Sequence, residues 1–316
     1  MACATGRSGS DREAHVPMRV KRWEGDRLEA AEGLAHLFDQ AWQETGGRGP
    51  RPAGWPTLVP GDDVVALTAH EGATLAGYAW VRPAPGMNMI DFIYARPGAR
   101  RGAVLQQLVR DGRAYAERCG VSPRLYLALN FWSRAPVPLD HLEPLRALGM
   151  RELEGVFLSR SLEPPPAPVS LPAGYRLRDW EDQDFEPACD LMERTPEPEP
   201  LYWDRGLCRR SILGAAGEGS PMFRDGFGQV VTCEGELAAL CLATRSGYVN
   251  HVYTDPRHQG RGLARALLGS VLRALARAGH RRATILTHAN NTRALTLYRR
   301  MGFTTLFTFP QFFCAW

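Results

Sequence analysis

The sequence predicts an α/β chain of two tandem domains, each built from a mixed sheet and covering helices. Three observations support this prediction. Apolar strands alternate with amphipathic helical stretches along the chain. A proline-rich linker, Leu162 to Val169, splits the 316 residues almost in half. The two halves also resemble each other, which indicates a repeated domain rather than a solenoid module.

The repeat is visible as a constant spacing between similar segments. Ile93–Pro97 is IYARP and Val252–Pro256 is VYTDP, an offset of 159 residues (252 − 93 = 159). Further along, Leu148–Met150 is LGM and Met301–Phe303 is MGF, an offset of 153 residues (301 − 148 = 153). We infer that each half is a complete α/β domain.

Composition and charge exclude several classes of protein. Apolar residues make up 44% and charged residues 23% of the chain, as in globular proteins. No apolar run approaches the ~20 residues of a membrane span. The polar segment Met1 to Pro17 lacks the apolar core of a signal peptide, so we expect a disordered tail there. The net charge of +4 is mild and the arginines are dispersed, which gives no sign of a nucleic-acid partner.

The cysteines indicate the cellular compartment of the protein, and the basic residues indicate the type of genome that encodes it. The seven cysteines form no CxxC pair, so neither a zinc site nor a disulfide framework is predicted. We therefore expect no metal and a reducing cytoplasm. Lys21 is the only lysine, a bias that is typical of a GC-rich bacterial genome.

In the second half, periodicity and turn residues predict six strands and four helices. The expected strands are Tyr175–Asp179, Gln229–Cys233, Leu237–Thr244, Gly247–Thr254, Arg282–Thr287 and one starting at Phe303. The expected helices are Asp182–Arg194, Tyr202–Leu213, Leu263–Arg277 and Thr292–Arg300.

The first half predicts a similar order. It contains expected strands at Asp63–Leu67, Thr74–Arg82, Asn88–Tyr94 and Leu125–Leu129, and an expected helix at Ala103–Arg118. The aromatic segment Phe309–Trp316 ends the chain. We expect it to pack in a strand or against the other domain, with a wall of a substrate pocket as the alternative.

The segment after Thr254 carries the clearest functional signal. An apolar strand runs into a short basic turn that contains Gly260 and Gly262, and a helix follows at Leu263. Backbone N–H groups and the positive helix end then point at one spot, which makes an anion site. Glycines let the backbone approach a ligand closely. The spacing matches neither GxGxxG nor GxxxxGK[ST].

Two segments carry a resemblance to a known family. The segment from Arg257 to Gly262 resembles the (R/Q)xxGx(G/A) pyrophosphate loop of the GNAT acetyltransferase superfamily, which binds acetyl-CoA. The segment from Asn291 to Phe303 resembles that family's NxxAxxxYxxxGF pattern, and it follows a strand and opens a helix. The resemblance covers about Leu171 to Trp316 well and the first half weakly.

The resemblance implies two GNAT-type domains with the order β-α-α-β-β-β-α-β-α-β in the second half. We expect a degenerate N-terminal domain at 18–161, a linker at 162–171, and a C-terminal domain at 172–316 that binds acetyl-CoA and is catalytic. The implied function is transfer of an acetyl group from acetyl-CoA to a primary amine of a small-molecule or peptide acceptor, by direct attack. A monomer or a homodimer is expected, without nucleic-acid or membrane partners.

The resemblance also implies the residues of the site. The backbone of the loop cradles the phosphates, the strand end hydrogen-bonds the pantetheine arm and the acyl carbonyl, and Tyr298 donates a proton to the departing thiolate. Asn291 caps the helix and contacts the cofactor. The full set expected to bind acetyl-CoA is Val252, Tyr253, Thr254, Arg257, Gln259, Gly260, Arg261, Gly262, Leu263, Ala264, Asn291 and Tyr298.

The general base is the open question of this site. The strand that enters the loop has no carboxylate, so His251 is the candidate, provided that a β-bulge turns it inward. A structural role for His251 is the alternative. His288, at the end of the next strand, or a positioned water could serve instead.

The first half differs from the second at the ligand loop. Arg101 stands where Gly260 stands in the second half, and Leu145 stands where Tyr298 stands. We expect the long side chain to block the close approach of a pyrophosphate to the backbone. A register shift that uses Gly102, with Arg100 and Arg101 holding phosphate by charge, is the alternative.

Two other functions stay open at this point. A non-catalytic acyl-CoA-binding or regulatory protein would need the loop but not the base. A different acyl donor, such as succinyl-CoA, would use the same loop and a pocket of another shape.

Overall fold

The computed structural model describes residues 18–22, 36–37, 40, 43–44, 65–82, 88–98, 100–119, 125–128, 139–196, 204–216 and 226–314. The predicted N-terminal tail, residues 1–17, lies outside the described residues. So do the last two residues, 315–316, and the predicted element ends at Asp63, Leu129 and Tyr202.

The first half contains the predicted hairpin, strands and helix, with shifted ends. Its strands are β1 (Met18–Arg22), β2 (Val65–Glu71), β3 (Thr74–Arg82), β4 (Asn88–Ala95), β5 (Leu125–Ala128) and β6 (Arg151–Ser161). Its helices are α2 (Arg101–Arg118) and α3 (Leu139–Ala147).

The second half has the predicted order of strands and helices. Its strands are β7 (Tyr175–Asp179), β8 (Gly228–Cys233), β9 (Glu236–Ala243), β10 (Tyr248–Thr254), β11 (Arg282–His288) and β12 (Thr304–Cys314). Its helices are α4 (Phe185–Arg194), α5 (Arg205–Ala216), α6 (Leu263–Arg277) and α7 (Thr292–Arg300). The 3-10 turns η1 (Asp182–Asp184) and η2 (Pro256–His258) precede α4 and follow β10.

The described strands form one sheet in the order β1-β2-β3-β4-β5-β12-β6-β11-β10-β9-β8-β7. The order is the same from either edge: β1 to β5 from one side match β7 to β11 from the other. In both halves the fifth strand runs parallel to the fourth, β5 to β4 and β11 to β10. The sheet therefore has an approximate two-fold relation between its halves, as the sequence repeat predicts.

The two halves exchange their last strands at the centre of the sheet. Strand β12, at the end of the chain, pairs with β5 of the first half, where Phe312 lies opposite Leu127. Strand β6, at the end of the first half, pairs with β11, where Val156 lies opposite Thr287. The aromatic C-terminal segment is therefore a strand packed against the other half, as expected. A boundary drawn by chain order at the linker does not divide the fold in space.

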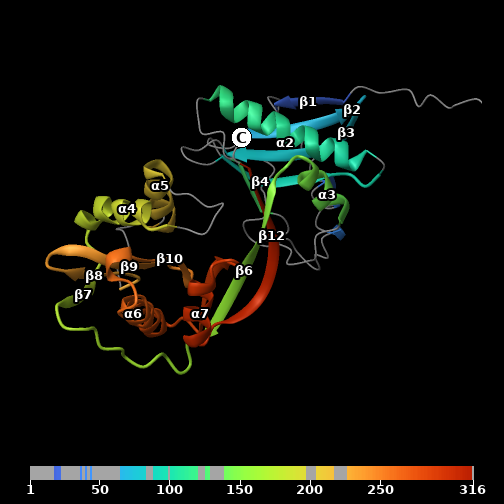
Figure 1. Cartoon of the computed structure of the whole chain (residues 1–316). Helices are drawn as coiled ribbons and strands as arrows, with labels where there is room; N and C mark the ends of the chain where they lie inside the picture. Colours follow the sequence, from blue (N-terminus) through green and yellow to red (C-terminus); the bar gives the residue numbers. More distant parts are fainter. Residues whose placement is uncertain are drawn as a thin grey trace, which may run out of the picture.

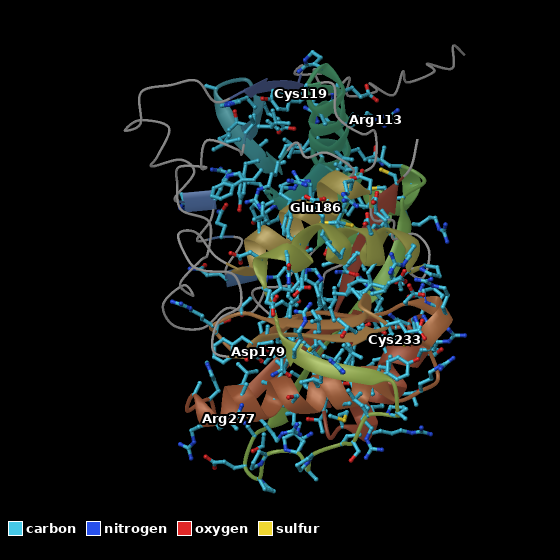
Figure 2. The ribbon with its side chains drawn as sticks, turned by 90° about the vertical axis from the view of Figure 1, so that its left-hand side faces the viewer. Arg113, Cys119, Asp179, Glu186, Cys233 and Arg277 are labelled. Carbon is cyan, nitrogen blue, oxygen red and sulfur yellow. The ribbon has the colours of Figure 1, made fainter. Side chains whose placement is uncertain are left out.

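Helices cover both faces of the second half of the sheet (Figure 1). Helices α4 and α5 lie on one face, and α6 lies on the other. Side chains of α6 such as Leu267 pack with Val231 and Ile285 of the sheet. In Figure 2, Glu186 of α4 lies between the α2 end marked by Cys119 and the α6 end marked by Arg277. Among the described residues, no helix is both long and apolar enough to cross a lipid bilayer.

Candidate active site

A cleft opens where β10 and β11 part. The two strands pair only at Tyr248–Thr284 and Val249–Ile285, so their far ends separate and leave room between them. The resulting cleft has a volume of about 910 Å³. Its lining comes from the end of α4, the end of β10, the loop before α6 and the start of α7: Thr195, Pro196, Val252, Tyr253, Thr254, His258, Gln259, Gly260, Gly262, Leu263, Ala264, Arg265, Asn290, Asn291, Thr292, Arg293, Ala294, Leu297 and Tyr298.

The glycine loop forms one wall of this cleft. Gly260 and Gly262 have φ angles of +76° and +80°, in the left-handed region that side chains disfavour. Gly262 is the N-cap of α6 and no side chain caps this helix end. The N–H groups of the first turn of α6 therefore lack intrahelical partners. Together with the positive end of the helix dipole, these N–H groups make this wall of the cleft favourable for an anion.

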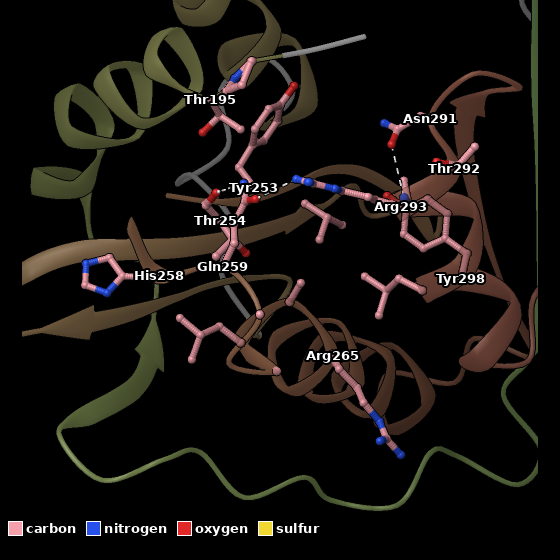
Figure 3. Close-up of a pocket in the computed structure, with 18 of the residues that line it drawn as sticks. Thr195, Tyr253, Thr254, His258, Gln259, Arg265, Asn291, Thr292, Arg293 and Tyr298 are labelled. Atoms are coloured by element: carbon pink, nitrogen blue, oxygen red, sulfur yellow. Dashed lines mark hydrogen bonds between the residues drawn. The ribbon is translucent and has the colours of Figure 1, made fainter. Parts of the chain in front are cut away.

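Gln259 and Arg293 connect opposite walls of the cleft. The Nε2 of Gln259 donates to the carbonyl oxygen of Thr254 at 3.2 Å. Its Oε1 accepts from Arg293, in the first turn of α7, at 3.0 Å. Figure 3 shows the long Arg293 side chain extending across the cleft toward the end of β10.

Tyr298 and Asn291 enter the cleft from α7, on the wall opposite the glycine loop. The Tyr298 ring is 6% exposed and lies beside Phe303, with ring centroids 6.0 Å apart. The Oδ1 of Asn291 accepts from the N–H of Ala294 at 3.2 Å, which confirms the predicted cap. Figure 3 shows both residues on the α7 side of the cleft.

The arginines of the loop are engaged outside the cleft. The Nε of Arg257 donates to Asp255 at 3.1 Å, and its guanidinium also reaches Glu236. The guanidinium of Arg261 lies over the ring of Tyr175, 5.8 Å from the ring centroid. Neither arginine lines the cleft.

Asp255 anchors the loop to the body of the domain. Its carboxylate is 1% exposed and accepts from the backbone N–H of Arg257 at 2.8 Å. It also accepts from the Nε of Arg194 on α4 at 2.7 Å. Hydrogen bonds from Arg257, and then from Arg194, hold the pKa of this carboxyl well below its usual range. The loop is thus tied by an ionised, buried carboxylate.

His251 lies beside the cleft but does not line it. The predicted bulge is present between Val249 and His251, where β10 pairs with β9. Because of this extra residue, Val249 and Val252 both face the α6 core, while His251 faces the layer of α4 and α5. His251 is 3% exposed. Its ring centroid lies 5.9 Å from that of Tyr253, which does line the cleft.

Burial sets the charge of both candidate histidines. Burial lowers the pKa of His251 to about 4, against a smaller opposing effect of the Ser211 backbone carbonyl. Burial also lowers the pKa of His288 to about 4, and a hydrogen bond with Gln311 opposes that shift. His288 packs against Phe313, 6.4 Å between ring centroids, and is not part of the cleft lining. Both rings are therefore neutral at pH 7.

The equivalent region of the first half is filled by a side chain. Arg101 is 6% exposed, donates its Nε to the carbonyl of Ala95 at 3.0 Å and forms an ion pair with Glu44. Its guanidinium also lies 5.7 Å from the ring centroid of Tyr94. The guanidinium therefore turns inward, toward the strand end, rather than outward to a ligand.

The helix that follows this loop also starts earlier than in the second half. Helix α2 begins at Arg101, whereas α6 begins at Leu263, three residues later on the repeat offset (263 − 159 = 104). The residues at 101 and 103, arginine and alanine, adopt helical backbone where glycines turn the loop in the second half. A loop of the second-half shape is thus absent from the described residues of the first half.

Sequence reasoning missed several residues of this region. Arg293 lies between Asn291 and Ala294, within the segment from Asn291 to Phe303 that resembles the family pattern. Its place in that segment could have indicated that it lies near the site. Thr195 and Ser211 carried no sequence signal, because their positions, beside the cleft and beside His251, depend on how α4 and α5 pack over the sheet. Among the described residues, no group of His, Cys, Asp or Glu side chains is arranged to hold a metal ion.

Comparison with known sequences gives two kinds of match. The family model described as FR47-like protein matches residues 226–310. A mycothiol acetyltransferase from Kineococcus radiotolerans is 28% identical over 272 residues, which cover 81% of this chain and 83% of that protein. A mycothiol acetyltransferase from Geodermatophilus obscurus is 29% identical over 299 residues, 87% of each chain. The sequence similarity to these mycothiol acetyltransferases thus extends over both halves of the chain.

Solved structures share the fold over nearly the whole chain. A GCN5-related N-acetyltransferase from Sphaerobacter thermophilus superposes with a TM-score of 0.63 at 20% identity, covering 94% of this chain and 95% of that one. A tandem GNAT protein from the clavulanic acid biosynthesis pathway gives a TM-score of 0.55 at 14% identity, covering 94% and 98%. The shared fold therefore includes both repeats and the joint sheet.

Proposed function

We propose that the chain is a tandem two-domain acetyltransferase of the GNAT superfamily, and that its second half transfers an acetyl group from acetyl-CoA to a primary amine by direct attack. The acceptor is a small molecule or the amino group of a peptide. The first half acts as a structural partner that binds no acyl-CoA of its own.

One observation carries this proposal: the glycine loop, the end of β10 and the phenol of Tyr298 border a single cleft. An anion site alone would fit many phosphate ligands. A proton donor on the opposite wall adds the second requirement of thioester chemistry, because the departing thiolate is stabilised when it receives a proton.

Each wall has its own part in the proposed reaction. The N–H groups of the loop and of the first turn of α6 hold the phosphates of the co-substrate. Backbone groups at Val252 to Thr254 hold the pantetheine arm and polarise the thioester carbonyl, where negative charge develops during attack. Tyr298 donates its proton to the sulfur as the carbon–sulfur bond breaks. Arg293 and Gln259 must exchange partners, or move aside, when a ligand fills the cleft.

The acceptor is proposed by chemistry rather than by identity. Both curated relatives described above are called mycothiol acetyltransferases. The acceptor of those enzymes therefore heads the list of amines to test, followed by amino sugars, aminoglycoside antibiotics and peptide N-termini.

A non-catalytic acyl-CoA-binding protein is the second candidate function. The burial of His251 favours this candidate. The β10 residues that line the cleft are Val252, Tyr253 and Thr254, and none of their side chains is an ordinary general base. The position of Tyr298 favours the enzyme. Turnover of acetyl-CoA with any amine would exclude the second candidate.

The first test is calorimetric titration of acetyl-CoA into the intact chain and two variants. We expect one site per chain, loss of that site in Gly260→Arg, and no second site in Arg101→Gly. Two sites in the unaltered chain would contradict the proposed role of the first half. No binding at all would contradict the proposed function.

The second test separates binding from chemistry. Release of the CoA thiol is followed with each amine of the panel, and with succinyl-CoA in place of acetyl-CoA. We expect acetyl-CoA to be consumed only when an acceptor is present. Binding without turnover across the whole panel would favour the non-catalytic candidate.

A further inference from the structure

A hydrogen-bonded group of three residues lies next to the cleft, on the face of the sheet that carries α4 and α5. Ser211 comes from α5, and Asn250 and His251 come from the bulge of β10. The Ser211 Oγ lies 3.2 Å from the Nε2 of His251. The Nδ2 of Asn250 lies 3.0 Å from the same Nε2. Two polar side chains thus converge on one ring nitrogen of a buried histidine.

The partners of Asn250 determine which way these hydrogen bonds run. Its Nδ2 donates to the backbone carbonyl of Ser211 at 3.4 Å, which fixes the orientation of the amide. An amide nitrogen can only donate. With the Asn250 amide in this orientation, the Nε2 of His251 accepts, and the proton of the neutral ring is then on Nδ1. Since Nε2 accepts, the Ser211 hydroxyl donates its proton inward, to the histidine.

Because the Ser211 hydroxyl donates its proton to His251, its oxygen can only accept a hydrogen bond from any further partner. The hydroxyl has one proton, which is used, and its remaining lone pairs accept. The Ser211 side chain is partly exposed, whereas His251 is buried beneath it. A group that presents only lone pairs matches the N–H bonds of a neutral amine, and it does not match a carbonyl or a carboxylate.

The group also lies close to the cleft. His251 packs against Tyr253, and Val252, between them in sequence, lines the cleft with Tyr253. Thr195, at the end of α4, lines the cleft from the same helical layer to which Ser211 belongs. Ser211 does not line the cleft itself, and its link to the cleft runs through His251, which packs against Tyr253.

We propose that Ser211 receives the N–H of the acceptor amine and relays its proton to His251, which makes this pair the base of the reaction. The inference rests on the proposed acetyl transfer and adds its acceptor side. His251 alone is too buried to meet the amine, and the hydroxyl supplies the missing contact.

The step balances in atoms and protons. The amine nitrogen forms a bond to the thioester carbon, and a proton passes from that nitrogen to the Ser211 Oγ as the serine proton passes to the His251 Nε2. The carbon–sulfur bond breaks and the sulfur takes the proton of Tyr298. The products are the amide and the CoA thiol. Exchange with water then removes the added proton from His251 and returns a proton to the Tyr298 oxygen.

Asn250 and Ser211 have opposite effects on the stability of the charged, imidazolium form of His251. A protonated Nε2 would face the donor group of Asn250, which disfavours the imidazolium. The backbone carbonyl of Ser211 favours it. Replacement of Asn250 by aspartate would put an acceptor and a charge beside Nε2 and so raise the pKa of His251.

The test uses the full chain with Ser211→Ala, Ser211→Thr and Asn250→Asp. Ser246→Ala is the matched control, because Ser246 is exposed in the turn before β10 and bonds only to Thr244 among the described residues. Acetyl-CoA affinity is measured by calorimetry, and kcat is measured against pH with the best amine of the panel. The protonation of His251 is followed by nitrogen-15 NMR of the labelled ring.

We expect Ser211→Ala to bind acetyl-CoA like the unaltered chain and to lose about 100-fold in kcat, the usual contribution of a general base. Ser211→Thr keeps the hydroxyl and restores most of the activity. Asn250→Asp moves the acidic limb of the pH profile to higher pH, and the NMR titration of His251 moves with it.

Distinct results would overturn the relay and the acetyl transfer. If the unaltered chain fails to bind acetyl-CoA, both proposals are wrong. If binding and turnover are present and Ser211→Ala keeps its kcat, only the relay is wrong. A loss in Ser211→Ala that Ser211→Thr does not restore, together with a lower melting temperature, would show that Ser211 serves packing alone and would also overturn the relay.

Discussion

The Nε of Arg101 donates to the carbonyl of Ala95 at 3.0 Å, and at the equivalent place in the second half the side chain of Gln259 donates to the carbonyl of Thr254 at 3.2 Å. Ala95 and Thr254 are related by the repeat offset (254 − 95 = 159). The same strand-end carbonyl is thus held by a buried arginine in one half and by a cleft residue in the other. This difference distinguishes the first half from the half that is proposed to bind acetyl-CoA.

Loss of Arg101 should destabilise the first half without affecting acetyl-CoA binding. Arg101→Ala leaves Glu44 and the Ala95 carbonyl without their partner, which we expect to lower the free energy of unfolding by about 2–3 kcal/mol. Arg113→Ala removes an exposed ion pair with Glu117 and should change the free energy of unfolding by less than about 0.5 kcal/mol. Urea unfolding measures both. Equal effects in the two variants would contradict the buried role of Arg101.

Tyr298→Phe should separate catalysis from binding. The variant keeps the ring that packs beside Phe303 but loses the proton donor, so kcat should fall by about 10²-fold or more with little change in acetyl-CoA affinity. Tyr115→Phe on α2 is a distant control and should leave kcat unchanged. A Tyr298→Phe enzyme with full activity would show that the thiolate leaves without this phenol.

Asp255→Asn should loosen the glycine loop. The buried carboxylate accepts from two arginines and a backbone N–H, and an amide cannot satisfy all of these donors. We expect a loss of about 2 kcal/mol in the free energy of unfolding and weaker acetyl-CoA binding. Asp190→Asn, in an exposed pair with Arg205, should change neither. Calorimetry and thermal unfolding would show the contrast, and unchanged affinity would argue against the loop anchor.

Acid should destabilise the protein through its buried histidines. The folded pKa of His251 is about 4 and its unfolded value is about 6.5. Between these values the unfolded state binds the proton more tightly, so stability is retained above about pH 6.5 and falls as the pH drops toward 4. The contribution of His251 is on the order of 3 kcal/mol.

Unfolding measured from pH 7 to pH 4 tests this expectation. His251→Gln should flatten the curve in part, while His288, whose pKa is also lowered to about 4, continues to contribute. Substitution of His36, which is exposed, is the control for the removal of a histidine side chain. A curve that His251→Gln does not alter would show that the ring is charged or hydrated in the folded state.

Removal of β12 should unfold both halves. A chain that stops at residue 302 leaves β5 and β6 without the neighbour that lies between them. Because of the strand exchange, residues 1–167 and 168–316 should each fail to fold alone and should assemble when produced together. Circular dichroism and size-exclusion chromatography would test this. A sharp melting transition of either isolated fragment would contradict it.

The sequence predicted the local parts of this fold well. The second-half elements, the repeat and the cap at Asn291 follow from patterns within a few residues of one another, where spacing and turn residues decide the outcome. Helix α2 was predicted to start at Ala103 and starts at Arg101, because arginine and alanine continue a helix where glycines would interrupt it. The helices and strands of both halves could thus be predicted from short stretches of the chain.

The proposed site was only partly accessible to the same reasoning. Loop, strand end and Tyr298 carry a recognisable spacing, and they line one cleft. Arg257 fits the pattern equally well, and Arg261 stands at an unspecified position within it, yet the structure pairs them with Asp255 and Tyr175 outside the cleft. A motif gives the type of residue at a position but not the partner that its side chain finds.

The sequence by itself determined that this chain repeats one α/β unit, that only the second copy keeps a glycine loop before a helix, and that Tyr298 has no counterpart in the first copy. The tertiary structure decided that β6 and β12 are exchanged, that Arg101 turns inward, and that His251 and Ser211 meet. These features depend on contacts between residues far apart in the chain. Such contacts are set by packing and burial over the whole sheet, which no local pattern encodes.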